Sequence, residues 1–142
     1  TKPVADAFVK KAECVKNQFD GYTAIDELKL KGDLTLGENV ADLAGMKLSH
    51  QAMLDWYAQK GLPLEGADRY SASQQFFLGF AQSWCTKSRP ETARLRAATD
   101  PHSPPYWRVN GPLGNLDAFK RAFSCRDAAP MIRKGTERCE VW

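Results

Sequence analysis

Apolar residues recur at the three- and four-residue spacing of an amphipathic helix in several stretches of this chain. The first such stretch, residues 3–19, carries one apolar stripe among lysines, formed by Val4, Phe8, Ala12, Val15 and Phe19. Pro3 suits the first turn of a helix, and Asp20 and Gly21 end the pattern. We therefore predict a helix here and assign no chemistry to it.

The second stretch predicts a long helix from about residue 36 to near Gly61. Before it, residues 28–31 alternate like a short strand. Thr35 is a plausible N-cap, and Glu38 follows three residues later, as in a capping box. Gly61 and Pro63 stand where residues that end helices are expected.

The third stretch predicts a buried helix from residue 75 to about residue 86. Ser71 and Gln74 fit a capping box that opens it. The stretch is apolar nearly all round, which is typical of a core element, because it carries Phe76, Phe77, Phe80 and Trp84.

The rest of the chain predicts shorter elements. A short helix begins at Pro90. Residues 97–108 then form a connection whose backbone is strongly restricted by four prolines in this neighbourhood, counting Pro112. Asn115 is expected to cap a helix whose inward residues are Leu116, Phe119, Ala122 and Phe123. The tail from Asp127 is expected to be irregular and anchored by Cys139 and Trp142.

The composition indicates a globular protein but assigns no function to it. The 142 residues suit one domain, and 43% hydrophobic and 26% charged residues are ordinary for a globular protein. A net charge of +3, with no basic tract among aromatics, argues against nucleic acid as a partner. No apolar run is long enough to span a membrane, and the chain opens at Thr1 without a signal peptide.

Two carboxylates lie one helical turn apart in the long helix. Glu38 and Asp42 share a face. At 100° per residue, that face continues through small and apolar residues, namely Gly45, Ser49, Met53 and Trp56. A solvated stripe would normally carry its charge onward, so we expect the pair to point inward. His50 lies on the opposite, more polar side and is expected at the surface.

A buried carboxylate needs a partner, because an unpaired charge in a low-dielectric interior is very costly. The spacing of Glu38 and Asp42 permits either a structural salt bridge to Arg or Lys, or a metal ion. The capping box offers Glu38 a third role, which needs no metal.

The four cysteines, Cys14, Cys85, Cys125 and Cys139, show none of the close spacing of a zinc site. They are either reduced, buried thiols of a cytosolic protein or partners in disulfides formed in an oxidising compartment.

Several blocks, in order, resemble the neprilysin-like zinc metallopeptidases. Residues 37–45, Gly-Glu-Asn-Val-Ala-Asp-Leu-Ala-Gly, are similar to the second zinc motif of that family. The family's buried helix is similar to residues 75–85, and its substrate-binding loop to residues 99–104 and 108–111. Its C-terminal ending is similar to residues 122–126 and 139–142. The resemblance covers roughly residues 10–142. The HExxH motif of the family, which supplies two histidine ligands and the general base, does not occur in this sequence.

The resemblance implies a mainly α fold: the helical C-terminal part of a thermolysin-like (gluzincin) catalytic domain, with short irregular or β segments. Residues 1–142 would then be one incomplete domain, and we expect the chain to be a piece of a longer protein. The resemblance also implies a disulfide between Cys14 and Cys139 and an extracytoplasmic location. Cys85 and Cys125 match positions whose partners lie upstream, so here they are free, mispaired or bonded to each other.

The resemblance further implies a role for each candidate site residue. Glu38 matches the third zinc ligand, and Asp42 matches the carboxylate that accepts the N–H of a zinc-bound histidine. His102 matches the donor to the oxyanion, and Asp100 is close enough in sequence to hold it charged. Arg108 matches the residue that grips a substrate carbonyl. A rigid loop is suited to hold such residues, although a stiff surface connection would look similar.

The expected function is therefore the C-terminal portion of a zinc-dependent endopeptidase that acts on peptides. With only two histidines, His50 and His102, the chain cannot build the site alone. We expect it to be inactive and to bind Zn2+ weakly or not at all without the remainder of its own catalytic domain. Two alternatives stay open: a non-catalytic, disulfide-stabilised helical interaction module, and a cytosolic helical protein in which Glu38 and Asp42 make buried salt bridges.

Overall fold

The computed structural model describes residues 1–66 and 69–141 of the chain. Helices dominate it, as predicted, and the strands form one small antiparallel hairpin. None of the helices in these two ranges is long and apolar enough to cross a bilayer. In chain order the elements are α1 (Lys2–Asp20), β1 (Thr23–Ile25), β2 (Leu28–Lys29), α2 (Gly32–Lys60), α3 (Ala72–Ser83), α4 (Pro90–Thr99), α5 (Pro105–Leu113), α6 (Asp117–Ala122) and the 3-10 helix η1 (Gly135–Glu137).

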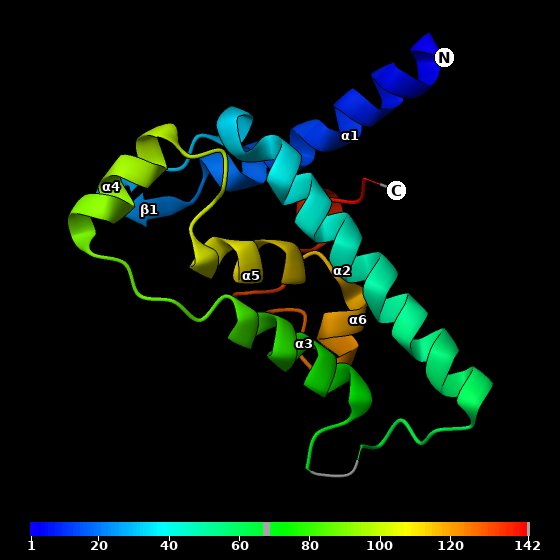
Figure 1. Ribbon diagram of the computed structural model, residues 1–142. Coiled ribbons are helices and arrows are strands. Elements are labelled where there is room, and N and C mark those ends of the chain that lie inside the picture. The colour runs from blue at the N-terminus through cyan, green and yellow to red at the C-terminus, as the bar shows by residue number, and fades with distance from the viewer. Residues whose placement is uncertain (67–68, 142) are drawn as a thin grey trace.

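Helix α1 is confirmed, and its second half packs against the rest of the protein. Val15 and Phe19 are each 1% exposed and belong to one core with residues of α2, α3, α5 and the tail. The first eleven residues are exposed, and Figure 1 shows this end of α1 projecting away from the other helices. Burial, not helix propensity alone, therefore fixes the C-terminal half of α1.

Helix α2 begins earlier than predicted, at Gly32, and is capped from outside. The Asp20 carboxylate at the end of α1 accepts the Gly32 N–H at 2.6 Å. Thr35 lies inside the helix, where its hydroxyl donates to the Lys31 carbonyl. The predicted capping box of Thr35 and Glu38 is therefore wrong, because a residue distant in sequence satisfies the helix start. The predicted end is confirmed, since Gly61 has a left-handed φ of 62°.

The buried face of α2 differs from the predicted one. The core receives Val40, Leu43 and Met46, whereas Gly45 and Ser49 are exposed. Trp56, at the far end of the predicted inward stripe, is 52% exposed. The stripe that begins with the acidic pair is therefore partly covered at Glu38, Asp42 and Met53 and exposed elsewhere. The prediction failed at the exposed positions because the neighbouring elements pack against the other side of the helix.

His50 is buried, so its predicted surface position is wrong. Its side chain is 6% exposed and shares a hydrogen bond of 2.9 Å with the Ser73 hydroxyl. The ring stacks on Phe77 at 5.0 Å between centroids. Burial lowers the pKa of His50, and the nearby charge of Arg121 lowers it further.

This burial predicts an acid-sensitive fold. A histidine whose folded pKa is depressed binds a proton more readily in the unfolded chain, so stability falls as the pH drops through the ordinary histidine pKa of about 6.5. We expect thermal melts of the chain to show a lower Tm at pH 5.5 than at pH 7.5. His50→Phe should flatten that dependence. Equal pH slopes in the two proteins would contradict the assignment.

Helix α3 opens with the predicted capping box, since Ser71 Oγ accepts the Gln74 N–H and Gln74 Oε1 accepts the Ser71 N–H. Its burial is less complete than predicted. Phe77 is 1% exposed and packs edge-on against Phe119 of α6, but Gly79 is exposed. One side of α3 is therefore open among the described residues, whereas the prediction made it a core element on all sides.

Two predictions near the C-terminus need correction. The rigid connection ends at Pro104, and α5 then begins with Pro105 in its first turn and keeps Pro112 near its end. Proline tolerates both places, because the ring fits an N-terminal turn and the α5 helix stops one residue after Pro112. Asn115 does not cap α6. Its buried amide donates to Gln18 and accepts the Cys139 N–H at 2.8 Å, which joins α1 to the tail.

The disulfide between Cys14 and Cys139 is confirmed, with a Cα–Cα distance of 5.5 Å. Cys85 and Cys125 are free thiols in this structure, the former exposed. The tail after α6 is irregular apart from η1, as predicted. The predicted anchoring by Trp142 lies outside the described residues.

Candidate functional site

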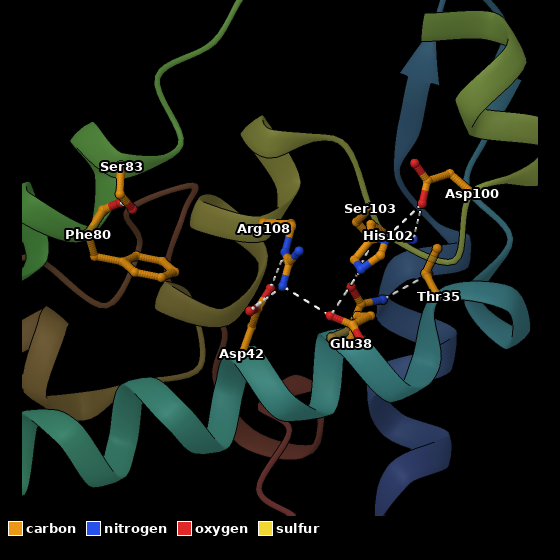
Figure 2. A network of polar contacts seen from close by, with 10 residues as sticks. Thr35, Glu38, Asp42, Phe80, Ser83, Asp100, His102, Ser103 and Arg108 are labelled. Carbon is orange, nitrogen blue, oxygen red and sulfur yellow. Dashed lines mark hydrogen bonds and ion pairs between the residues drawn. The ribbon is translucent and has the colours of Figure 1, made fainter.

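Three segments meet above the start of α2 (Figure 2): the first turns of α2 itself, the loop of residues 100–104, and the first turn of α5. Prolines on both sides of His102 and Ser103 restrict the loop backbone. All four predicted site residues lie in these segments, and the structure brings them into direct contact.

Arg108 and Asp42 form the buried half of the site. The guanidinium donates from Nε to Asp42 Oδ2 and from Nη2 to Oδ1, both at 2.7 Å, and each side chain is 11% exposed. The guanidinium also lies 4.1 Å from the centre of the Trp84 ring, a cation–π contact. The hydrogen bonds that Arg108 donates to Asp42 raise the pKa of Arg108 above its already high value. This two-bond pair fixes Arg108 in direction as well as in charge.

Glu38 forms the open half of the site. Its Oε2 accepts a 3.3 Å hydrogen bond from Arg108 Nη2 and lies 3.5 Å from His102 Nε2, and its side chain is 41% exposed. The other oxygen, Oε1, accepts no hydrogen bond from residues 1–66 or 69–141. The salt-bridge reading of the acidic pair therefore holds for Asp42, whereas Glu38 keeps an oxygen available for another ligand.

His102 is held by Asp100 from the side away from Glu38. Asp100 Oδ1 accepts both the backbone N–H of His102 at 3.0 Å and its ring Nδ1–H at 2.7 Å. The backbone bond, followed by the ring bond, lowers the pKa of Asp100, so this carboxylate is ionised at neutral pH. With Nδ1 committed to Asp100, the ring presents Nε2 toward Glu38 and the opening of the site.

A buried polar network that the sequence analysis missed lies beneath these residues. Ser103 Oγ donates to Asn39 Oδ1 at 2.8 Å, and Asn39 Nδ2 donates to Thr35 Oγ1 at 2.9 Å. Asn39 and Ser103 are 1% and 2% exposed. The spacing of Thr35 and Asn39, four residues apart on α2, could have indicated a polar pair, but nothing in it pointed to Ser103.

A cavity of about 450 Å3 adjoins the site. His102 and Arg108 are among its lining residues, together with Trp84, Ala97, Pro105 and Tyr106. The polar residues thus border a space of the size and mixed lining typical of small-ligand and peptide sites.

The donor set fits zinc only in part. Among residues 1–66 and 69–141, no cluster of three or more His, Cys, Asp or Glu side chains could hold a metal ion. A catalytic zinc site takes three protein ligands and an open position. Glu38, with a half-exposed carboxylate and a free oxygen, fits one of those three positions.

Sequence and structure comparisons agree on one family. The model of peptidase family M13 matches residues 2–139. The chain is 42% identical to an endothelin-converting enzyme homolog of Locusta migratoria and 38% identical to endothelin-converting enzyme-like 1 of Mus musculus, over 96% and 95% of its length. The zinc metalloprotease Zmp1 of Mycobacterium tuberculosis, solved with an inhibitor, superposes with a TM-score of 0.87 at 33% identity over 94% of this chain.

These matches cover part of each relative. The chain spans 19% and 17% of the two curated proteins and 21% of the Zmp1 chain. The resemblance to neprilysin-like metallopeptidases is nevertheless confirmed along nearly all of its residues. By family model, by identity and by fold alike, the chain belongs to peptidase family M13.

Proposed function

We propose that this chain is the part of a zinc-dependent endopeptidase that supplies the third metal ligand and the residues that bind substrate and transition state. The observation that carries the proposal is the convergence of Glu38, Asp42, His102 and Arg108, from three segments, on one opening. The similarity to the zinc metalloprotease Zmp1 supports it. The two remaining ligands and the general base come from residues outside this sequence.

In this proposal, Glu38 ligates zinc through the oxygen that Arg108 leaves free. A zinc ion held there would supply Lewis-acid polarisation of a substrate carbonyl and a water of lowered pKa as the nucleophile. The weaker 3.3 Å contact from Arg108 holds the carboxylate near its position without occupying both oxygens. Glu38 therefore needs little rearrangement to accept a metal.

Asp42 has two tasks in the complete site. Its bonds to Arg108 use one lone pair of each oxygen, and an ionised carboxylate offers about four acceptor positions. The remaining positions can accept the N–H of a metal-bound histidine from outside this chain, which would fix the tautomer of that ligand. One buried carboxylate would thus align a ligand histidine and a substrate-binding arginine together.

His102 and Arg108 act on the substrate. His102 donates from Nε2 to the oxygen that becomes negative during attack, and Asp100 stabilises the charged ring from the other side. Arg108 offers the rest of its guanidinium fork to a substrate carbonyl, because Asp42 holds the group in place. Peptides are therefore the proposed substrates, and the cavity beside both residues gives them space.

Two further properties follow from the same proposal. The remainder of the catalytic domain is the main partner of this chain, since one ligand does not make a zinc site. An extracytoplasmic location is supported by the Cys14–Cys139 disulfide, because such bonds persist mainly in oxidising compartments. On its own the chain should bind zinc weakly or not at all.

The test uses the longer protein that contains this sequence. We expect it to cleave peptides, to lose activity on chelation and to regain it with Zn2+. His102→Ala should lower kcat by about 100- to 1,000-fold, the effect of removing one oxyanion donor. His102→Gln, which keeps a neutral donor, should lose less. Peptide cleavage that survives complete zinc removal, or an unchanged kcat in folded His102→Ala, would contradict the proposal.

A further inference from the structure

The spacing between Glu38 and His102 is not fixed by any strong direct contact. Their closest approach is 3.5 Å, and both side chains are nearly half exposed. Asp100 orients the His102 ring but lies in the same loop, so it cannot hold that loop against α2. The Arg108–Asp42 pair joins α5 to α2 six residues beyond His102, so a contact next to His102 would set the distance between the loop and α2 more directly.

The buried bond between Ser103 and Asn39 is placed to do this. Ser103 directly follows His102, and Asn39 directly follows Glu38. Adjacent Cα atoms are 3.8 Å apart, so a bond between these neighbours ties the loop beside His102 to the helix beside Glu38 at short range. The bond is 2.8 Å long, and both partners are almost fully excluded from water.

The Asn39 amide is itself oriented from its other end. Asn39 Nδ2 donates to Thr35 Oγ1, so the Oδ1 atom is turned toward the loop. Loss of the Ser103 hydroxyl would leave that oxygen buried and unpaired, and the loop would be free to shift to relieve it. Loss of the Thr35 hydroxyl would leave Asn39 Nδ2 without this acceptor, but Ser103 would still bond the Asn39 amide, because a hydroxyl can donate to its oxygen or accept from its nitrogen.

We propose that Asn39 and Ser103 are positioning residues: their bond holds the oxyanion donor His102 at a fixed distance from the metal ligand Glu38. The inference rests on the function proposed above and extends it to two residues that touch neither metal nor substrate. Ser103 acts on the loop side of the bond. Glu38 is held independently by α2, so the position of His102, not the metal site, depends on Ser103.

The experiment compares Ser103→Ala with Thr35→Val in the longer, zinc-loaded protein. Each removes one hydroxyl from the same buried network, so both should lower Tm to a similar extent. Ser103→Ala should reduce kcat by about 10- to 100-fold with little change in KM or zinc affinity, because a displacement near 1 Å suffices for such a loss. Thr35→Val should keep kcat near the unmodified value. Ser103→Thr, which restores a hydroxyl, should recover most of the rate.

Three results would overturn the inference. One is an equal loss of kcat in Ser103→Ala and Thr35→Val, which would indicate a general effect on stability. Another is a loss of zinc affinity in Ser103→Ala that is large enough to explain its lower kcat. The third is a Ser103→Thr protein with unmodified Tm and no recovered rate. A different result would contradict the proposed function itself: the unmodified longer protein would show no zinc-dependent cleavage. That result would also remove the basis of this inference.

Discussion

Glu38→Gln should abolish zinc-dependent cleavage by the longer protein and weaken its zinc affinity by more than about 100-fold. Replacing a residue that merely orients a metal ligand already costs about 10- to 100-fold, and a neutral amide is a poorer ligand than a carboxylate. The exchange is nearly isosteric, so packing does not account for the loss. Zinc affinity by chelator competition and peptide cleavage are the two measurements.

The fold should survive this change, which separates a metal role from a structural one. Glu38 makes only longer contacts, 3.3 Å to Arg108 and 3.5 Å to His102, among the described residues, whereas the pair of Arg108 and Asp42 keeps both of its 2.7 Å bonds. Exposed ion pairs contribute about 0–1 kcal/mol, so Tm should change little. Glu91→Gln, an exposed glutamate in α4, is the matched control and should leave zinc affinity unchanged. Zinc bound as tightly by the Glu38 variant as by the control would remove Glu38 from the metal site.

Removing the Cys14–Cys139 bond should produce the largest loss of stability in this chain. The bond joins residues 125 apart in sequence, and chain-entropy models give about 4–5 kcal/mol for closing such a loop. For a domain of this size, that corresponds to a fall in Tm of about 10–20 °C. The doubly substituted variant Cys14→Ser with Cys139→Ser should show it in thermal melts under non-reducing conditions.

The other two cysteines supply the control. Cys85 and Cys125 are free, so Cys85→Ser with Cys125→Ser should leave the Tm of this chain nearly unchanged. A reducing agent should lower the Tm of that control protein to the level of the Cys14 and Cys139 variant. Equal melting of both double variants without reductant would show that the bond adds nothing to stability.

Much of the site was predictable because its residues lie within short sequence motifs. Residues 37–45 and 99–111 matched motifs, and the structure brings Glu38, Asp42, His102 and Arg108 together from them. The capping box at Ser71 was predictable for a similar reason, since it depends on residues three apart. In both cases the information lies within a few residues of the feature.

Features that depend on distant partners were missed. His50 is buried because Ser73 and Phe77 cover it, which no periodicity within α2 reveals. Helix α2 begins at Gly32, before the predicted start, because Asp20 of α1 accepts the Gly32 N–H. Asn115 does not cap α6, because its side-chain amide forms hydrogen bonds with α1 and the tail instead. Helical spacing gives the residues of each face, but only packing decides which face is inside.

The bond between the first helix and the tail also turns most of this chain into a covalent ring. Residues 14–139 close on themselves through Cys14 and Cys139. A protease that cuts the backbone once anywhere inside that ring opens it without releasing either half. On a denaturing gel the nicked chain would run as one band until a reductant separated it, so a single clip could pass unnoticed in the oxidised protein.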